Sequence, residues 1–367
     1  MKRRMTFPTL AVATVAAMTL AACGGGTSEE TAGGGTSEET AGGGASEEAG
    51  GKVDISDAET VFKLAFNQTA EHPQYLAGQQ LGQDLYEATD GRYAIEVFAN
   101  EELGTQADVV QNLSDGTVEM MYIGGPVMES FNEDFIVFNL PYVFDSLEAQ
   151  SAVLNDEEVV GDLYTSIEDS KNITVLAGLH AGVRNVYNSK QAITEPADLE
   201  GLKIRVQQSD SQVAMIEAMG AVASPLGQGE VYSALQTGAL DGAENNETVF
   251  DALKHDEVAK FYSYTRHLLI PDYLLINTQV LEEMPDEDRE AFLELIPGAV
   301  EEADAGLVDF AEESRVAAEE LGAEFNDDVD IEAFEETVAP LVESSINNDV
   351  RQALFDAVNA SNEANAG

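Results

Sequence analysis

Strand-like segments alternate with helix-like segments over most of the chain after residue 60. Short apolar runs at 62–66, 93–98 and 118–123 are typical of buried strands. Between them, 74–89 and 105–113 carry apolar residues at helical spacing and are followed by Asp-Gly pairs. Because parallel strands need a crossover helix, this alternation predicts α/β units with largely parallel sheets.

The alternation continues with strands at 174–179 and 203–206, and with helices around 213–219 and 230–237. The segment from 57 to the end, about 310 residues, is too long for a single core, so we expect two lobes. The last third is acidic and helical. Pro297-Gly298 interrupts its apolar spacing, which predicts a kink or two separate helices there.

The N-terminus reads as an export signal. Three basic residues, Lys2, Arg3 and Arg4, precede an apolar stretch too short to be a comfortable membrane span. The stretch ends in Leu-Ala-Ala-Cys23, which resembles the lipobox of bacterial lipoproteins. We therefore predict a signal peptide at 1–22 and lipidation of Cys23. The alternative is an ordinary signal peptide beside an idle thiol, a liability in an oxidising compartment.

Three near-copies of a short Gly-, Glu- and Thr-rich unit fill residues 27–51. No residue of the unit has an apolar side chain larger than that of alanine, so the unit cannot form a core. Residues 23–56 are therefore predicted to be an acidic Gly-rich linker that tethers the protein outside the cytoplasm, at the outer face of the cell membrane or in a periplasm.

Composition excludes several functions. The formal net charge is −52, which leaves no basic patch for nucleic acid and disfavours direct adhesion to anionic lipid. The sequence has no Gly-x-Ser-x-Gly motif, no phosphate-binding loop and no histidine pair at metal-ligand spacing. We expect a protein that is not an enzyme and uses neither cofactor nor metal.

Basic residues are scarce and therefore informative. Arg205 lies in the short strand 203–206, and Arg184 follows the apolar strand 174–179, where we expect the chain to cross between the lobes. A buried arginine can present two parallel N–H groups to a carboxylate. Spacing alone leaves two interpretations open for each: a ligand-binding group, or a structural salt bridge with one of 69 acidic residues.

Four segments in fixed order resemble one known family: 201–209, 218–221, 229–238 and 240–245. Together they are similar to the solute-binding component of the tripartite ATP-independent periplasmic (TRAP) transporters, the family of C4-dicarboxylate and sugar-acid receptors. The resemblance implies a two-lobed, periplasmic-binding-protein-like α/β fold with a long helical segment that spans the hinge. It places lobe I at 57–181 plus 270–309 and lobe II at 182–269 plus 310–360.

The resemblance also implies a binding cleft between the lobes and roles for particular residues. Arg205 matches the arginine that pairs with the ligand carboxylate, and Arg184 matches a second arginine that faces the ligand. Further predicted ligand-binding residues come from both lobes: Asn67, His72, Gln106, Gln208, Gln228 and Asn245.

The segments 206–210 and 243–246 are most similar to relatives associated with uronates, with C4-dicarboxylates as the next choice. The implied partners are a small carboxylate ligand, a TRAP-type permease, and the membrane through the lipid anchor. Two alternatives stay open: a ligand receptor of another transporter or sensor, and a secreted enzyme whose site was not recognised.

Overall fold

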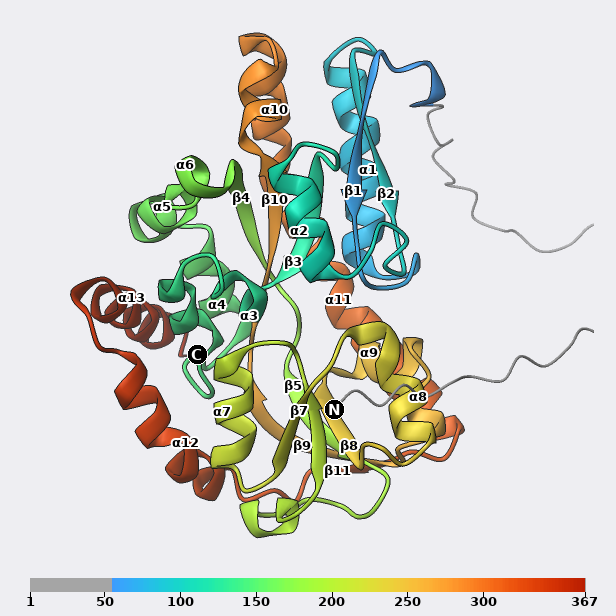
Figure 1. Ribbon diagram of the computed structural model, residues 1–367, viewed down its shortest axis with the longest axis vertical. Helices are drawn as coiled ribbons and strands as arrows, with labels where there is room; N and C mark the ends of the chain where they lie inside the picture. The colour runs from blue at the N-terminus through green and yellow to red at the C-terminus, as the bar shows by residue number, and fades with distance from the viewer. Residues whose placement is uncertain (1–54, 367) are drawn as a thin grey trace, which may run out of the picture. The chain divides into compact units, whose positions relative to one another are not determined.

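The computed structural model describes residues 55–366 (Figure 1). The predicted signal peptide, Cys23 and nearly all of the predicted linker lie outside these residues. Within 55–366, no helix is both long enough and apolar enough to cross a membrane.

Lobe I is built on a five-stranded sheet with the order β2-β1-β3-β10-β4. Its strands are β1 (Thr60–Ala65), β2 (Tyr93–Phe98), β3 (Met120–Gly124), β4 (Ile173–His180) and β10 (Pro271–Asn277). Its helices are α1 (Pro73–Ala88), α2 (Gln106–Ser114), α3 (Gly125–Met128), α4 (Leu147–Leu154), α5 (Glu157–Thr165), α6 (Glu168–Lys171) and α10 (Thr278–Glu283). Two apolar clusters pack on its faces, one beneath α1 and one beneath α4 and α5.

Lobe II is built on a six-stranded sheet with the order β11-β9-β5-β8-β6-β7. Its strands are β5 (Arg184–Asn188), β6 (Lys203–Val206), β7 (Val222–Pro225), β8 (Gly242–Asn245), β9 (Phe261–Leu268) and β11 (Glu324–Asn326). Its helices are α7 (Asp210–Ala218), α8 (Val231–Gln236), α9 (Glu247–Ala252) and α12 (Ile331–Ser345).

Both sheets are mixed, so the expectation of largely parallel sheets was wrong. Strand β10 is antiparallel to both β3 and β4, and β5 is antiparallel to both β8 and β9. The cause is the crossing of the chain between the lobes. It leaves lobe I through β4 into β5 and returns through β9 into β10. A strand that enters a sheet from the cleft must run against neighbours that end there.

One helix, α11 (Asp286–Glu320), spans the two lobes (Figure 1). It packs against α1 and β4 of lobe I and against α9 of lobe II. Of the two outcomes predicted at Pro297-Gly298, two separate helices is wrong, because Pro297 lies inside this continuous helix, and the kink stays a prediction. A mid-helix proline costs roughly 3 kcal/mol. Burial of Phe292, Ile296 and Val300 in the core of lobe I offsets that cost.

The predicted lobe boundaries stay a prediction, and one segment packs differently from it. The first part of helix α13 (Asp349–Asn365), up to residue 360, falls within the range assigned to lobe II. Its residues Leu354 and Val358 nevertheless belong to a core cluster of lobe I. The Asn362 side chain also donates to the Val143 carbonyl at 2.8 Å, so helix α13 packs on lobe I.

Candidate functional site

Two small adjoining cavities lie between the lobes, where the strands of both sheets end. The Arg205 cavity has a volume of about 140 Å³, and the Arg184 cavity about 20 Å³. They share lining residues from lobe I, Asn67 and Gln106, and from lobe II, Gln207 and Gln228. Every residue that the sequence pointed to lines at least one of them: Asn67, His72, Gln106, Arg184, Arg205, Gln208, Gln228 and Asn245.

Arg205 is a buried cation without a counter-charge bonded to it. It sits in β6 between Ser224 of β7 and Ala243 of β8, and its side chain is 3% exposed. The guanidinium Nε donates to the Leu226 carbonyl at 2.9 Å, but no carboxylate of residues 55–366 forms an ion pair with it. Burial lowers the pKa of Arg205 to about 10. The group stays charged at neutral pH, so an anion entering this cavity would find an unneutralised partner.

Arg184, the first residue of β5, uses all three of its guanidinium nitrogens in hydrogen bonds to protein groups. Its Nε and Nη2 donate to the two carboxylate oxygens of Glu244 at 2.6 and 2.7 Å, and Nη1 donates to Asn245 Oδ1 at 2.8 Å. Burial alone would lower the pKa of Arg184, but Glu244 raises it. The structural salt bridge, one of the two interpretations left open for this residue, is therefore present. Arg184 lines its cavity with its charge already neutralised.

Two other predicted residues, Asn245 and His72, also form hydrogen bonds within the protein. Asn245 Oδ1 accepts from Arg184 and from the Asn246 backbone N–H at 3.0 Å. His72 caps α1, with its Nδ1 accepting from the Gln74 backbone N–H at 3.2 Å. Burial lowers the pKa of His72 to about 3, so the ring is neutral and cannot pair electrostatically with a carboxylate.

Sequence reasoning missed several residues that line the cavities: Gln68, Glu101, Thr105, Gln207, Asn246 and Asp272. Gln207 and Asn246 directly follow or precede predicted site residues, and that adjacency was a usable signal. Asp272 carried no such signal, because it is one of 69 acidic residues and its place beside Gly124 depends on the pairing of β10 with β3.

A direct bridge between the lobes closes one end of the cleft. The Glu129 carboxylate, just after α3, accepts from Ser211 Oγ at 2.7 Å and from Ser209 Oγ at 3.1 Å, both at the start of α7. Asn139 of lobe I also donates to it at 2.9 Å. Burial raises the pKa of Glu129 to about 7. The two lobes are thus held together by hydrogen bonds beside the cavities.

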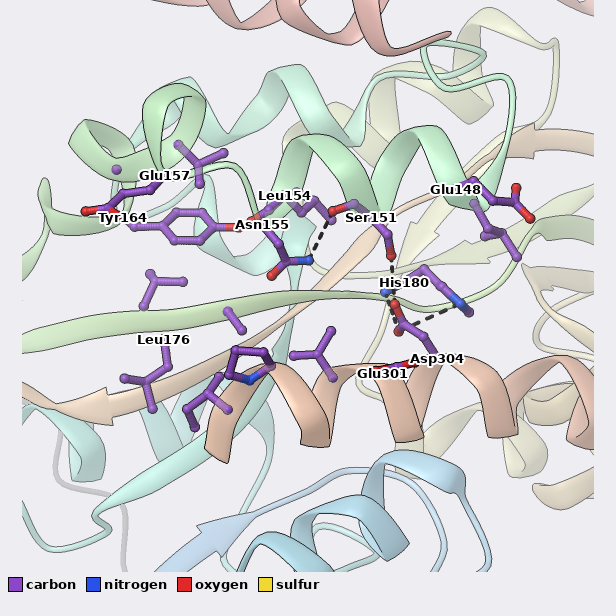
Figure 2. Close-up of a pocket in the computed structure, with 18 of the residues that line it drawn as sticks. Glu148, Ser151, Leu154, Asn155, Glu157, Tyr164, Leu176, His180, Glu301 and Asp304 are labelled. Atoms are coloured by element: carbon purple, nitrogen blue, oxygen red, sulfur yellow. Dashed lines mark hydrogen bonds and ion pairs between the residues drawn. The ribbon is translucent and has the colours of Figure 1, made fainter. Parts of the chain in front are cut away.

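A much larger groove, about 920 Å³, lies away from the cleft, between α4, α5, β4 and α11 (Figure 2). Its floor is apolar, and at one end Asp304 accepts from Ser151 Oγ at 2.7 Å and lies 3.7 Å from His180 Nε2. None of the residues that line it is a lysine or an arginine. Since it offers an anion no cation, size does not make it the better candidate for a carboxylate.

Residues 64–349 match the model of a family described as bacterial extracellular solute-binding protein, family 7 (DctP). The chain belongs to this family. A curated member, the C4-dicarboxylate-binding periplasmic protein DctP of Rhodobacter capsulatus, is 30% identical over 274 residues, which are 68% of this chain and 80% of that protein.

Solved structures of family members extend the match to three dimensions. A TRAP periplasmic solute-binding protein from Anaerococcus prevotii, with bound D-glucuronate, superposes with a TM-score of 0.81 at 36% identity, covering 83% of this chain and 99% of that one. Another from Xanthobacter autotrophicus, with bound β-D-galacturonate, gives 0.77 at 29% identity, covering 82% and 99%.

These matches confirm the predicted fold, two α/β lobes spanned by a long helix. They also confirm the predicted function class. This chain is an extracytoplasmic solute-binding protein of the TRAP type, from a family of binding proteins and not of enzymes.

Proposed function

We propose that this receptor binds a hexuronate such as D-glucuronate or D-galacturonate, with the ligand carboxylate on Arg205 in the Arg205 cavity. The observation that carries the proposal is the buried guanidinium, which has one hydrogen bond to a backbone carbonyl and no ion-pair partner among residues 55–366. Uronate complexes of family members from two other bacteria support this ligand class.

A carboxylate on Arg205 would replace the solvation that burial has removed. Deleting one partner of such a desolvated, charge-assisted hydrogen bond costs about 2–5 kcal/mol of binding free energy. The remaining predicted residues, Asn67, Gln106, Gln208 and Gln228, would contact the rest of the ligand from both lobes. Contacts to both lobes favour the closed arrangement, so binding and closure would be coupled.

We further propose that the closed, loaded receptor hands its ligand to a TRAP-type permease and that Cys23 is lipidated to keep it nearby. A diacylated cysteine supplies the two chains that stable anchoring needs, and the repeats at 27–51 would act as the tether. Replacing Cys23 with serine should move the protein from the membrane fraction to the soluble fraction. Equal membrane retention of both forms would contradict the anchor.

The ligand proposal is tested by calorimetric titration of the purified protein with glucuronate, galacturonate, glucose and succinate. We expect tight binding of both uronates and none of glucose, which has the ring hydroxyls but no carboxylate. Binding of glucose as tight as that of the uronates would contradict the role of Arg205.

A second ligand class, C4-dicarboxylates, has one specific observation in its favour, the 30% identity to the C4-dicarboxylate-binding protein of Rhodobacter capsulatus. Arg205 would serve such a ligand equally well. Succinate binding more tightly than both uronates in the same titration would replace the first proposal with this one.

A further inference from the structure

We infer that Asp272 and Gln207 form hydrogen bonds with hydroxyl groups of the ligand at the end of the site away from Arg205. Asp272 also disfavours ligands that carry a second carboxylate at that end. The inference rests on the proposed function, because it assumes that an organic acid is held by Arg205. Beyond that function, we infer that the part of the ligand farthest from the carboxylate on Arg205 is uncharged and rich in hydroxyl groups.

The first observation is the convergence of three polar atoms on one bare stretch of backbone. Asp272 of β10 pairs with Gly124 of β3. A methyl group on Gly124 would lie 2.9 Å from Gln207 Nε2, 3.6 Å from Asp272 Oδ1 and 3.6 Å from Gln106 Oε1. The space in front of the bare Gly124 backbone is thus bordered by one amide donor and two acceptor oxygens, contributed by both lobes, and one of these, Gln106 Oε1, already accepts from the Gly124 N–H at 3.4 Å.

The second observation is that buried polar atoms beside this space lack partners. Gln207 Oε1 and Gln228 Nε2 are buried and make no hydrogen bond. Buried polar groups are nearly always satisfied, and leaving one unpaired costs about 1–3 kcal/mol. A hydroxyl group donates one hydrogen bond and can accept two, so one hydroxyl can pair with an acceptor such as the Asp272 carboxylate or Gln207 Oε1 and also accept from an amide N–H.

The third observation is the size of the space. The Arg184 cavity, which Asp272 lines, has a volume of about 20 Å³. One water-sized group occupies roughly 10–15 Å³ on this scale. The cavity is therefore narrow, and a hydroxyl group needs less room in it than a carboxylate does.

The fourth observation is the balance of charge. Arg184, the cation whose charge acts on Asp272, is already paired with Glu244, so this end of the site carries a net negative charge. Burial raises the pKa of Asp272 to about 6, which leaves the group ionised at pH 7.5. A carboxylate accepts hydrogen bonds and donates none, so a ligand hydroxyl is a suitable partner and a ligand carboxylate is repelled.

The test compares the wild type with Asp272→Asn, which keeps the shape and one acceptor oxygen but removes the charge. Affinity is measured for D-glucuronate by calorimetry. Competition against glucuronate then compares two open-chain acids, D-gluconate and D-glucarate, which differ only in a terminal hydroxymethyl or carboxylate group. We expect the wild type to prefer gluconate to glucarate. In Asp272→Asn, glucuronate affinity should fall roughly 10- to 100-fold and that preference should shrink or reverse.

Asp304→Asn is the matched control. Asp304 is a carboxylate of lobe I whose charge reaches Asp272 and raises its pKa, but it lies in the outer groove and does not line either cavity (Figure 2). It should leave the gluconate preference intact. Gly124→Ala is a second variant with ordinary backbone angles, φ −68° and ψ 138°. Its methyl group would occupy the hydroxyl space, so it should weaken glucuronate binding while the protein remains folded.

The outcomes separate the two claims. If the wild type binds no uronate, the proposed function fails. If it binds uronate but Asp272→Asn leaves both the affinity and the preference unchanged, only the present inference fails. An equal loss for gluconate and glucarate also overturns it, because Asp272 would then support the site without discriminating between ligands.

Discussion

The two arginines at the cleft, both buried to the same degree, are in opposite electrostatic states. Arg184 and Arg205 are each 3% exposed. Arg184 has two bonds to the Glu244 carboxylate, whereas Arg205 has one bond to a neutral carbonyl. The pKa of Arg184 is raised and that of Arg205 is lowered to about 10.

The difference teaches how a protein with a formal charge of −52 can admit an anion. Arg184 links the end of β5 to β8 through Glu244, so its charge stabilises the fold. Arg205 has no carboxylate bonded to it among residues 55–366, although Glu101 lines the same cavity. An unpaired buried charge costs stability in the empty protein, and a ligand carboxylate recovers that cost on binding.

The largest effect should follow from breaking the Arg184 pair. Arg184→Met leaves Glu244 buried, with His267 Nε2 at 3.5 Å as its remaining ion-pair partner among residues 55–366. We expect the free energy of unfolding to fall by about 3–5 kcal/mol. Urea denaturation measures this. The double variant Arg184→Met, Glu244→Gln removes both charges and should recover much of the loss. If the double variant is as unstable as the single one, the pair is not what holds these strands.

Arg205→Ala should show the opposite profile. It removes a charge that has no partner, so stability without ligand should change little or rise. Uronate affinity should fall by about 2–5 kcal/mol, which is roughly 30-fold to several thousand-fold. Calorimetry measures the uronate affinity, and thermal unfolding of the same samples without ligand measures the stability. Unchanged uronate affinity would contradict the assignment of Arg205 as the partner of the ligand carboxylate.

A smaller, pH-dependent effect is expected at Glu129, a partly buried acid whose partners are neutral. Its pKa is about 7 in the folded protein against an ordinary value of 4.5, so between these values the folded state binds more protons than the unfolded state. The free energy of unfolding should therefore fall as pH rises from about 4.5 to 7.

Glu129→Gln removes this titration. Relative to wild type it should gain about 2 kcal/mol between pH 5 and 7.5, because ionisation no longer costs it stability. Urea denaturation of both proteins at pH 5, 6 and 7.5 measures the difference. A difference that is constant with pH would show that Glu129 is ionised throughout and that its serine partners fully stabilise the charge.

Much of the fold could be predicted because it depends on local pattern. The strands 93–98 and 203–206 occur where their apolar runs indicated. The direction of β10 could not be predicted, since it depends on the chain returning from the other lobe. The continuity of α11 through Pro297 could not be predicted either, because packing outweighs a local preference there.

By itself, the sequence determined the two α/β lobes and the scarcity of cations, and it singled out Arg184 and Arg205 as the basic residues to consider. Only the tertiary structure decided which of them is paired. Arg184 meets Glu244 across 60 positions of sequence, and Asp272 meets Gly124 only through the register of β10 with β3. The physical reason is that neutralising a buried charge depends on distance in space, and among 69 acidic residues no spacing identifies the one that lies within reach.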